Sequence, residues 1–190
     1  ILAYSAEEWK DRDPNSAARH TFMRSLQERA DAVYFDNIGV GAGAKGAIRE
    51  EIDRLDRKAR APEFHGFNAA AAVQNPHHEY MPGKTNKDMF YNLKAQAWWT
   101  LGDRFRNTWL AVNGKPHDAD QLISLAADLP HLDKLRAELS QPRREFLNGK
   151  FRVESKKDMA ARGVKSPNLA DALVMAYAPE VNSFDLSALL

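Results

Sequence analysis

The chain has 190 residues, of which 44% are apolar and 28% charged, and its 27 basic and 26 acidic side chains leave a formal net charge of +1. This composition predicts one globular domain with a buried core, and it excludes collagen-like, disordered and disulfide-stapled proteins. Because cysteine is absent, thiol catalysis, cysteine-based zinc sites and iron–sulfur clusters are also excluded. No apolar run approaches the roughly 18 residues of a membrane span.

Residues 1–67 predict alternating strands and helices. The first expected elements are a strand over 1–9 and a helix that Asn15 or Ser16 caps and that runs to about Ala30. A buried strand over 32–35 then stops at Asp36 and leads to a flexible turn at Gly39, Gly41, Gly43 and Gly46. A helix to about Arg60 and a strand over 63–67 follow. This order favours an α/β fold with at least one parallel pair of strands. Since the chain opens inside an apolar stretch, we expect its natural start to lie upstream of Ile1.

The remainder of the chain predicts mainly helices. The expected elements are a loop over 74–88, a long helix over about 87–112, two short helices or a helix and a strand within 118–140, a β-hairpin turning at Asn148-Gly149, a short helix from about Ser155 to Gly163, and a last helix that Ser166 caps, with Pro167 in its first position, and that ends at Ala178. The domain is therefore expected over residues 1–178, with residues 179–190 as a C-terminal tail.

A GxGxxG pattern at Gly41, Gly43 and Gly46 follows a predicted strand and opens a helix, as in dinucleotide-binding turns. However, Asp36 at the strand end would repel a pyrophosphate, and no acidic residue for a ribose ends the strand over 63–67. A dinucleotide-binding oxidoreductase domain is therefore the less favoured alternative to a simple tight turn. Gly83-Lys84-Thr85 imitates the end of a P-loop without its first glycine, so no ATPase motif is expected in this chain.

Two carboxylates are candidate metal ligands and catalytic residues. Asp36 lies at the carboxyl end of a buried strand, where α/β sheets bind ligands, although a turn or capping aspartate would occupy the same place. Asp171 lies in a helix that is apolar on nearly every side, so its carboxylate should be at least half buried. It then needs a partner: a structural ion pair, backbone donors or a metal. Carboxylate oxygens suit Mg²⁺ or Mn²⁺, and two such ions can promote phosphodiester hydrolysis.

Four segments resemble, in the same order, motifs of the nuclease domains of tailed-phage large terminase subunits. They are the strand and glycine turn at Tyr34–Gly43, the long-helix motif at Tyr91–Trp99, the strand and helix at Phe151–Met159, and a closing Ser-Pro-Asp-x-x-Asp-Ala signature at Ser166–Leu173. In the last segment, Asn168 departs from the family's first aspartate. The resemblance covers about residues 34–177 and is more specific than any one motif alone.

The resemblance implies an RNase H-like mixed sheet flanked by helices, without its first strand in this chain. It also implies an endodeoxyribonuclease that uses two Mg²⁺ or Mn²⁺ ions to cut concatemeric phage DNA during packaging. Asp36 and Asp171 match two of the family's catalytic carboxylates, and a third aspartate would precede Ile1. The implied partners are double-stranded DNA, a portal protein, a small terminase subunit and an upstream ATPase domain, in the host cytoplasm. A noncatalytic DNA- or portal-docking module of the same fold is the main alternative.

The near-zero net charge hides an uneven distribution. Residues 134–165 hold ten basic and four acidic residues, a net charge of +6, and they lead into the helix of Asp171. Neutralisation of DNA phosphates requires such a basic segment. We therefore expect DNA contacts from this segment, with an ordinary solvated lysine as the other interpretation of Lys156. The candidate residues are Arg143, Arg144, Lys150, Arg152, Lys156 and Lys157.

Overall fold

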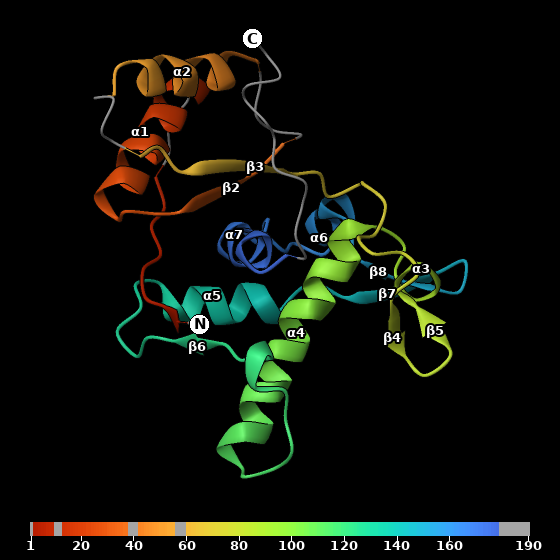
Figure 1. The fold of residues 1–190 in the computed structure, drawn as a ribbon. Coiled ribbons are helices and arrows are strands. Elements are labelled where there is room, and N and C mark those ends of the chain that lie inside the picture. Colours follow the sequence, from red (N-terminus) through yellow and green to blue (C-terminus); the bar gives the residue numbers. More distant parts are fainter. Residues whose placement is uncertain (1, 10–12, 38–41, 56–59, 179–190) are drawn as a thin grey trace. The chain divides into compact units, whose positions relative to one another are not determined.

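A computed structural model describes residues 2–9, 13–37, 42–55 and 60–178 of the chain (Figure 1). They divide into two compact units. The βαβ unit comprises the described residues from Trp9 to Ala69, and the α4 unit comprises those up to Glu8 together with those from Ala70 onward. The predicted tail at 179–190 lies outside the described residues, and the predicted domain over 1–178 stays a prediction.

The βαβ unit contains the predicted parallel strand pair. Helix α1 (Pro14–Gln27) precedes β2 (Ala32–Asp36), helix α2 (Ala42–Asp53) and β3 (Glu63–Phe67). Strands β2 and β3 pair in parallel, and α1 and α2 lie on the same side of the pair (Figure 1). The buried side chains of Phe22, Ile48 and Phe64 pack the helices against the strands. These alternating strands and helices confirm the α/β interpretation of residues 13–67.

Two local predictions in this unit are wrong. Helix α1 is capped by Asp13, whose carboxylate accepts the N–H groups of Asn15 and Ser16, so neither of these residues is the cap. Pro14, which needs no N–H partner, then takes the first helical position. The predicted flexible turn is also shorter than expected, because Gly43 and Gly46 lie inside α2. Gly39 and Gly41 lie outside the described residues.

The α4 unit begins with a very short strand. Strand β1 (Leu2–Ala3) pairs in parallel with β6 (Ser124–Leu125), so the strand predicted over 1–9 covers only two of the described residues. The segment predicted as a loop contains the antiparallel pair β4 (Glu79–Met81) and β5 (Lys84–Thr85). The predicted long helix is two helices, α3 (Asn86–Met89) and α4 (Leu93–Val112). The chain is extended at Phe90, and Asn92 caps α4 by accepting the N–H of Ala95.

The rest of the α4 unit follows the predicted order more closely. A short 3₁₀ helix, η1 (Ala119–Gln121), leads to β6 and then to α5 (Leu132–Ser140). Strands β7 (Arg144–Leu147) and β8 (Lys150–Val153) form the predicted hairpin, with positive φ angles of 51° at Asn148 and 76° at Gly149. Two positive φ angles define the tight turn that Asn-Gly favours. Helices α6 (Lys156–Ala161) and α7 (Asn168–Ala176) close the described chain.

A separate hydrophobic core holds the C-terminal half of the α4 unit together. Leu129, Leu135, Leu169 and Ala170 form its buried cluster, so α5 and α7 share one apolar interface. Helix α4 supplies further buried residues, including Leu93 and Leu101. None of the helices in the described ranges has the length and apolarity needed to cross a bilayer.

Candidate active site

Asp36 is the last residue of β2, and the register of the parallel pair fixes its place. It lies opposite Phe67, and the N–H of Asn37 donates to the carbonyl of Phe67 at 3.0 Å, which extends the ladder by one bond. A Cβ at Gly66 would approach Cγ of Asn37 to 3.1 Å. The glycine at position 66 therefore makes room for Asn37, the residue that follows Asp36. Asp36 itself is partly buried at this strand end.

Asp171 lies in the first half of α7, and its side chain is 20% exposed. Oδ2 of Asp171 lies 3.2 Å from Nζ of Lys156, the first residue of α6. The expectation that this carboxylate is at least half buried and has a partner is thus confirmed. The partner in the described structure is Lys156, whose side chain is 54% exposed. Its predicted contact with DNA stays a prediction.

Glu138 of α5, which the sequence analysis did not single out, holds the N-terminus of α7. Its buried carboxylate oxygen Oε2 accepts the N–H of Leu169 at 2.7 Å and that of Ala170 at 3.1 Å. The predicted cap was Ser166, but α7 begins at Asn168 and its N-cap, Pro167, makes no side-chain cap bond. Glu138 thus satisfies two N–H groups that a local cap would otherwise serve.

A lysine and a second glutamate extend this arrangement. Nζ of Lys134 lies 3.8 Å from Oε1 of Glu138, and it also donates to the carboxylate of Glu8. The hydrogen bond to Glu8 raises the pKa of Lys134. Charges of alternating sign therefore run from Glu8 through Lys134 to Glu138 and end at the N–H groups of α7. This chain links the segment after β1 to the helix that carries Asp171.

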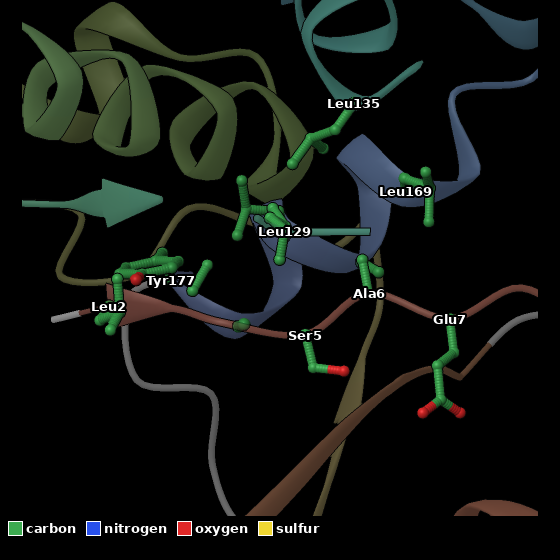
Figure 2. Close-up of a pocket in the computed structure, with 12 residues that line it drawn as sticks. Leu2, Ser5, Ala6, Glu7, Leu129, Leu135, Leu169 and Tyr177 are labelled. Carbon is green, nitrogen blue, oxygen red and sulfur yellow. The ribbon is translucent and has the colours of Figure 1, made fainter. Parts of the chain in front are cut away.

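The apolar side of α7 borders a cavity of about 440 Å³ (Figure 2). Leu129, Leu135 and Leu169 line it, with Leu2 and Tyr177 together at one end and Glu7 at the other. Since Leu169 also belongs to the buried cluster of this unit, α7 is fixed in rotation by its apolar face. The Asp171 carboxylate, which points to Lys156, does not line this cavity.

An ion pair between the exposed residue Arg162 and the buried residue Glu154 fixes α6, the helix that begins with Lys156. The carboxylate of Glu154 accepts from Nε and Nη2 of Arg162, both at 2.7 Å, and from the backbone N–H of Arg143 at 3.0 Å. These bonds favour the ionised carboxylate and lower the pKa of Glu154 to about 2. Because Glu154 and Arg162 flank α6 in sequence, the pair anchors both ends of the helix.

The other residues predicted to contact DNA lie on or beside the β7–β8 hairpin and differ in their surroundings. Nη2 of Arg152 lies 2.6 Å from a carboxylate oxygen of Glu145, so its charge is already paired. The guanidinium of Arg144 lies over the ring of Phe151 at 5.6 Å. Arg143 and Lys157 are exposed, and Lys150 is partly exposed. Arg143, Arg144, Lys150 and Lys157 are thus the better placed candidates for DNA phosphates.

Carboxylate oxygens are the ligand type that hard divalent cations prefer, so Asp36 and Asp171 fit Mg²⁺ or Mn²⁺ by chemistry. Across the described ranges, no cluster of three or more His, Cys, Asp or Glu side chains is arranged to hold a metal. Asp36 belongs to the βαβ unit and Asp171 to the α4 unit. Their shared role therefore stays a prediction.

The chain is similar to several solved structures. To the nuclease domain of the large terminase subunit gp2 of bacterial virus Sf6 it is 31% identical, with a TM-score of 0.76, over 88% of this chain and 73% of that one. A mutant of that domain with manganese and beta-thujaplicinol gives 30% identity and a TM-score of 0.77 over the same shares. A mutant with calcium is 30% identical, with a TM-score of 0.75, over 87% of this chain and 73% of that one. No family model and no curated protein matches the sequence.

Proposed function

Since this chain belongs to the family of nuclease domains of phage large terminase subunits and has their RNase H-like α/β fold, we propose that it is a metal-dependent DNA endonuclease of genome packaging. The observation that carries the proposal is the Asp171 carboxylate, largely buried and held on a helix whose N-terminus Glu138 caps. Asp36, which ends a strand in the βαβ unit, is the second proposed ligand.

Asp36 and Asp171 would hold Mg²⁺ or Mn²⁺ through carboxylate oxygens. When bound, a pair of such ions supplies an activated water and stabilises the leaving oxygen of a phosphodiester. The manganese and calcium in the solved relatives support a divalent ion. Lys156 contacts the Asp171 carboxylate through Oδ2 and so orients it. A lysine ammonium carries three donors, so Lys156 can contact Asp171 and a DNA phosphate together.

The substrate would be the concatemeric double-stranded phage DNA, with phosphates on Arg143, Arg144, Lys150 and Lys157. A portal protein, a small terminase subunit and an upstream ATPase domain are proposed as partners, in the host cytoplasm. These assignments rest on the family and on the net charge of +6 over residues 134–165. A cationic surface of this kind binds DNA without reading its sequence.

Cleavage of supercoiled plasmid in Mn²⁺ tests the proposal. We expect Asp171→Asn and Asp36→Asn to lower the rate by about 100-fold or more, because loss of a ligand removes metal-dependent rate enhancement. Asp133→Asn is the matched control, since the side chain of Asp133 is 98% exposed on α5. Calorimetric titration with Mn²⁺ gives an independent readout, in which both ligand variants should bind more weakly than the control. Equal cleavage and equal Mn²⁺ binding by all variants would contradict the ligand assignment. DNA binding with neither cleavage nor Mn²⁺ binding would favour the docking module.

A further inference from the structure

A second, polar groove of about 910 Å³ runs along α4 and shares Tyr177 with the apolar cavity at α7. All its lining residues belong to the α4 unit. Six of them come from α4: Arg106, and five that share one face of the helix, since these five are spaced by four, seven, eight and eleven residues from the first. They are Gln96, Thr100, Asp103, Arg104 and Asn107. This polar stripe extends about 16 Å along the helix axis.

Buried amides hold the floor of the groove in place. The side chain of Gln96 donates to the carbonyl of Gln74 at 3.0 Å and accepts its N–H at 2.7 Å. Asn86 donates to the carbonyls of Gln74 and Asn75, at 3.1 and 3.0 Å. Both amides are buried, at 4% and 6% exposure. The wall opposite α4 is therefore held by hydrogen bonds within the protein. Because this wall is already ordered, a ligand would not lose affinity by ordering it.

The carboxylates of the groove have hydrogen-bond donors, whereas its arginines have no carboxylate partner among the described residues. Asp103 accepts the hydroxyl of Tyr80 at 2.5 Å, and Asp118 accepts the N–H of Asp120 at 3.0 Å. In contrast, neither Arg104 nor Arg106 has an ion-pair partner among the described residues. Nη1 of Arg104 makes only two long bonds, of 3.3 and 3.4 Å, to backbone carbonyls.

The arginines elsewhere in this unit provide the comparison. Arg152 and Arg162 are each held by a glutamate at 2.6 to 2.7 Å. The groove thus presents two guanidinium groups without a carboxylate partner in the part of the chain that the structure describes, although Asp103 and Asp118 balance them in formal charge. Burial and the bond to Asp103 raise the pKa of Tyr80, whose single hydroxyl proton is donated to Asp103.

We propose that this groove binds a single strand of DNA, with phosphates on Arg104 and Arg106 and bases against Tyr80 and the amide of Asn107. Arginine side chains contact the phosphates of single strands and aromatic rings contact their bases in this way, and amides can contact base edges. The groove has the volume of a small-ligand pocket, which suits a few nucleotides of one strand. The proposal rests on the proposed function only in taking DNA as the substrate.

The groove also lies close to the helix of the candidate active site. Tyr177, the C-cap of α7, lines the groove and carries the guanidinium of Arg104 over its ring at 5.2 Å. Tyr177 follows Asp171 by six residues, which is about 9 Å along a helix axis. A strand in the groove would therefore lie near the end of the helix that carries the proposed metal ligand.

Fluorescence anisotropy with a short labelled single-stranded DNA of mixed sequence, in EDTA, tests this proposal. We expect the double variant Arg104→Gln, Arg106→Gln to raise the Kd about tenfold and to reduce the salt dependence of log Kd by roughly 1.4, the slope of two phosphate contacts to single strands. Arg60→Gln, which removes an exposed charge from the βαβ unit, is the control and should change the Kd less than about twofold. Circular dichroism confirms folding, and Arg106→Gln alone, at an exposed residue, gives a second test at minimal structural risk.

Three results would overturn the proposal. The first is equal binding by the double variant, the single variant and the control. The second is that an unlabelled duplex of the same sequence competes better than the single strand. The third is that a deoxynucleoside monophosphate binds as tightly as the oligonucleotide, which would indicate a site for free nucleotides. Because the assay contains no divalent metal and measures no cleavage, its failure leaves the nuclease proposal intact. Inactivity of Asp171→Asn likewise leaves the groove proposal intact.

Discussion

Removal of the Glu138 carboxylate should loosen the helix that carries Asp171. Oε2 of Glu138 accepts two N–H groups in the first turn of α7, at 2.7 and 3.1 Å, and the residue is 6% exposed. In Glu138→Ala both groups lose their acceptor in a site that water reaches poorly. Glu138→Gln keeps an oxygen in the same place and loses only the charge.

The expected magnitude follows from these two bonds. Hydrogen bonds to charged groups contribute about 1.5–3 kcal/mol each, and loss of a helix cap costs about 0.5–2 kcal/mol. Since one oxygen accepts both bonds, we expect Glu138→Ala to lower the free energy of unfolding by about 2–4 kcal/mol and Glu138→Gln by about 1 kcal/mol. Lys134 lies 3.8 Å from Glu138 but keeps its bond to Glu8, so its contribution is small.

Urea unfolding followed by tryptophan fluorescence measures this effect, because Trp98, Trp99 and Trp109 all lie in the α4 unit. Asp133→Ala, at a side chain that is 98% exposed, should change the stability by less than about 0.5 kcal/mol. In the cleavage assay, Glu138→Gln should retain most of the activity that Glu138→Ala loses. A Glu138→Ala variant as stable as the control would refute the capping role. If Glu138→Gln lowered the free energy of unfolding as much as Glu138→Ala, the acceptor oxygen would not be the source of the stabilisation.

Three further predictions concern single groups. Lys156→Met should tighten Mn²⁺ binding up to about tenfold in calorimetry, since a cation 3.2 Å from Oδ2 of Asp171 is removed, while Lys157→Met should not. Because the pKa of Glu154 falls from 4.5 to about 2 on folding, its stabilising effect is complete above about pH 4.5 and is lost as the pH falls to 2. The urea midpoint of Glu154→Gln should therefore vary less over this pH range than that of the unchanged protein. Gly149→Ala should lower the free energy of unfolding by about 1–2 kcal/mol because the φ of Gly149 is 76°, although nothing crowds a Cβ there. Gly102→Ala, inside α4, should raise it by about 0.5–1 kcal/mol, and equal effects of the two substitutions would refute the conformational explanation.

Features set by neighbouring residues were predictable from the sequence. The strand that ends at Asp36, its parallel partner and the Asn148-Gly149 turn follow from short apolar runs and local turn preferences. The resemblance, carried by four motifs, predicted the family and the fold class, both of which the solved relatives confirm. The partial burial of Asp171 was also predictable, because its helix is apolar on most sides.

Features set by distant residues were not predictable. Glu138 caps α7 from 31 residues away, and no local pattern marks it as a cap. The break at Phe90 separates two helices with their own N-caps, Thr85 for α3 and Asn92 for α4, within one continuous apolar pattern. Asp13, Asn15 and Ser16 are all good cap residues, and Pro14 decides among them by taking the first helical position. Lys156 could not be assigned to Asp171 because the pair joins two separate helices.

The two hydrophobic clusters have a consequence for how this chain melts. One is built around Phe22, Ile48 and Phe64 and the other around Leu129, Leu135 and Leu169, and each lies within its own unit. Cooperative unfolding follows from a shared core, so heating can give two calorimetric transitions instead of one. Asp36 would be lost with the first cluster and Asp171 with the second. Thermal inactivation of cleavage would then track the less stable unit, while the other proposed ligand is still in a folded environment.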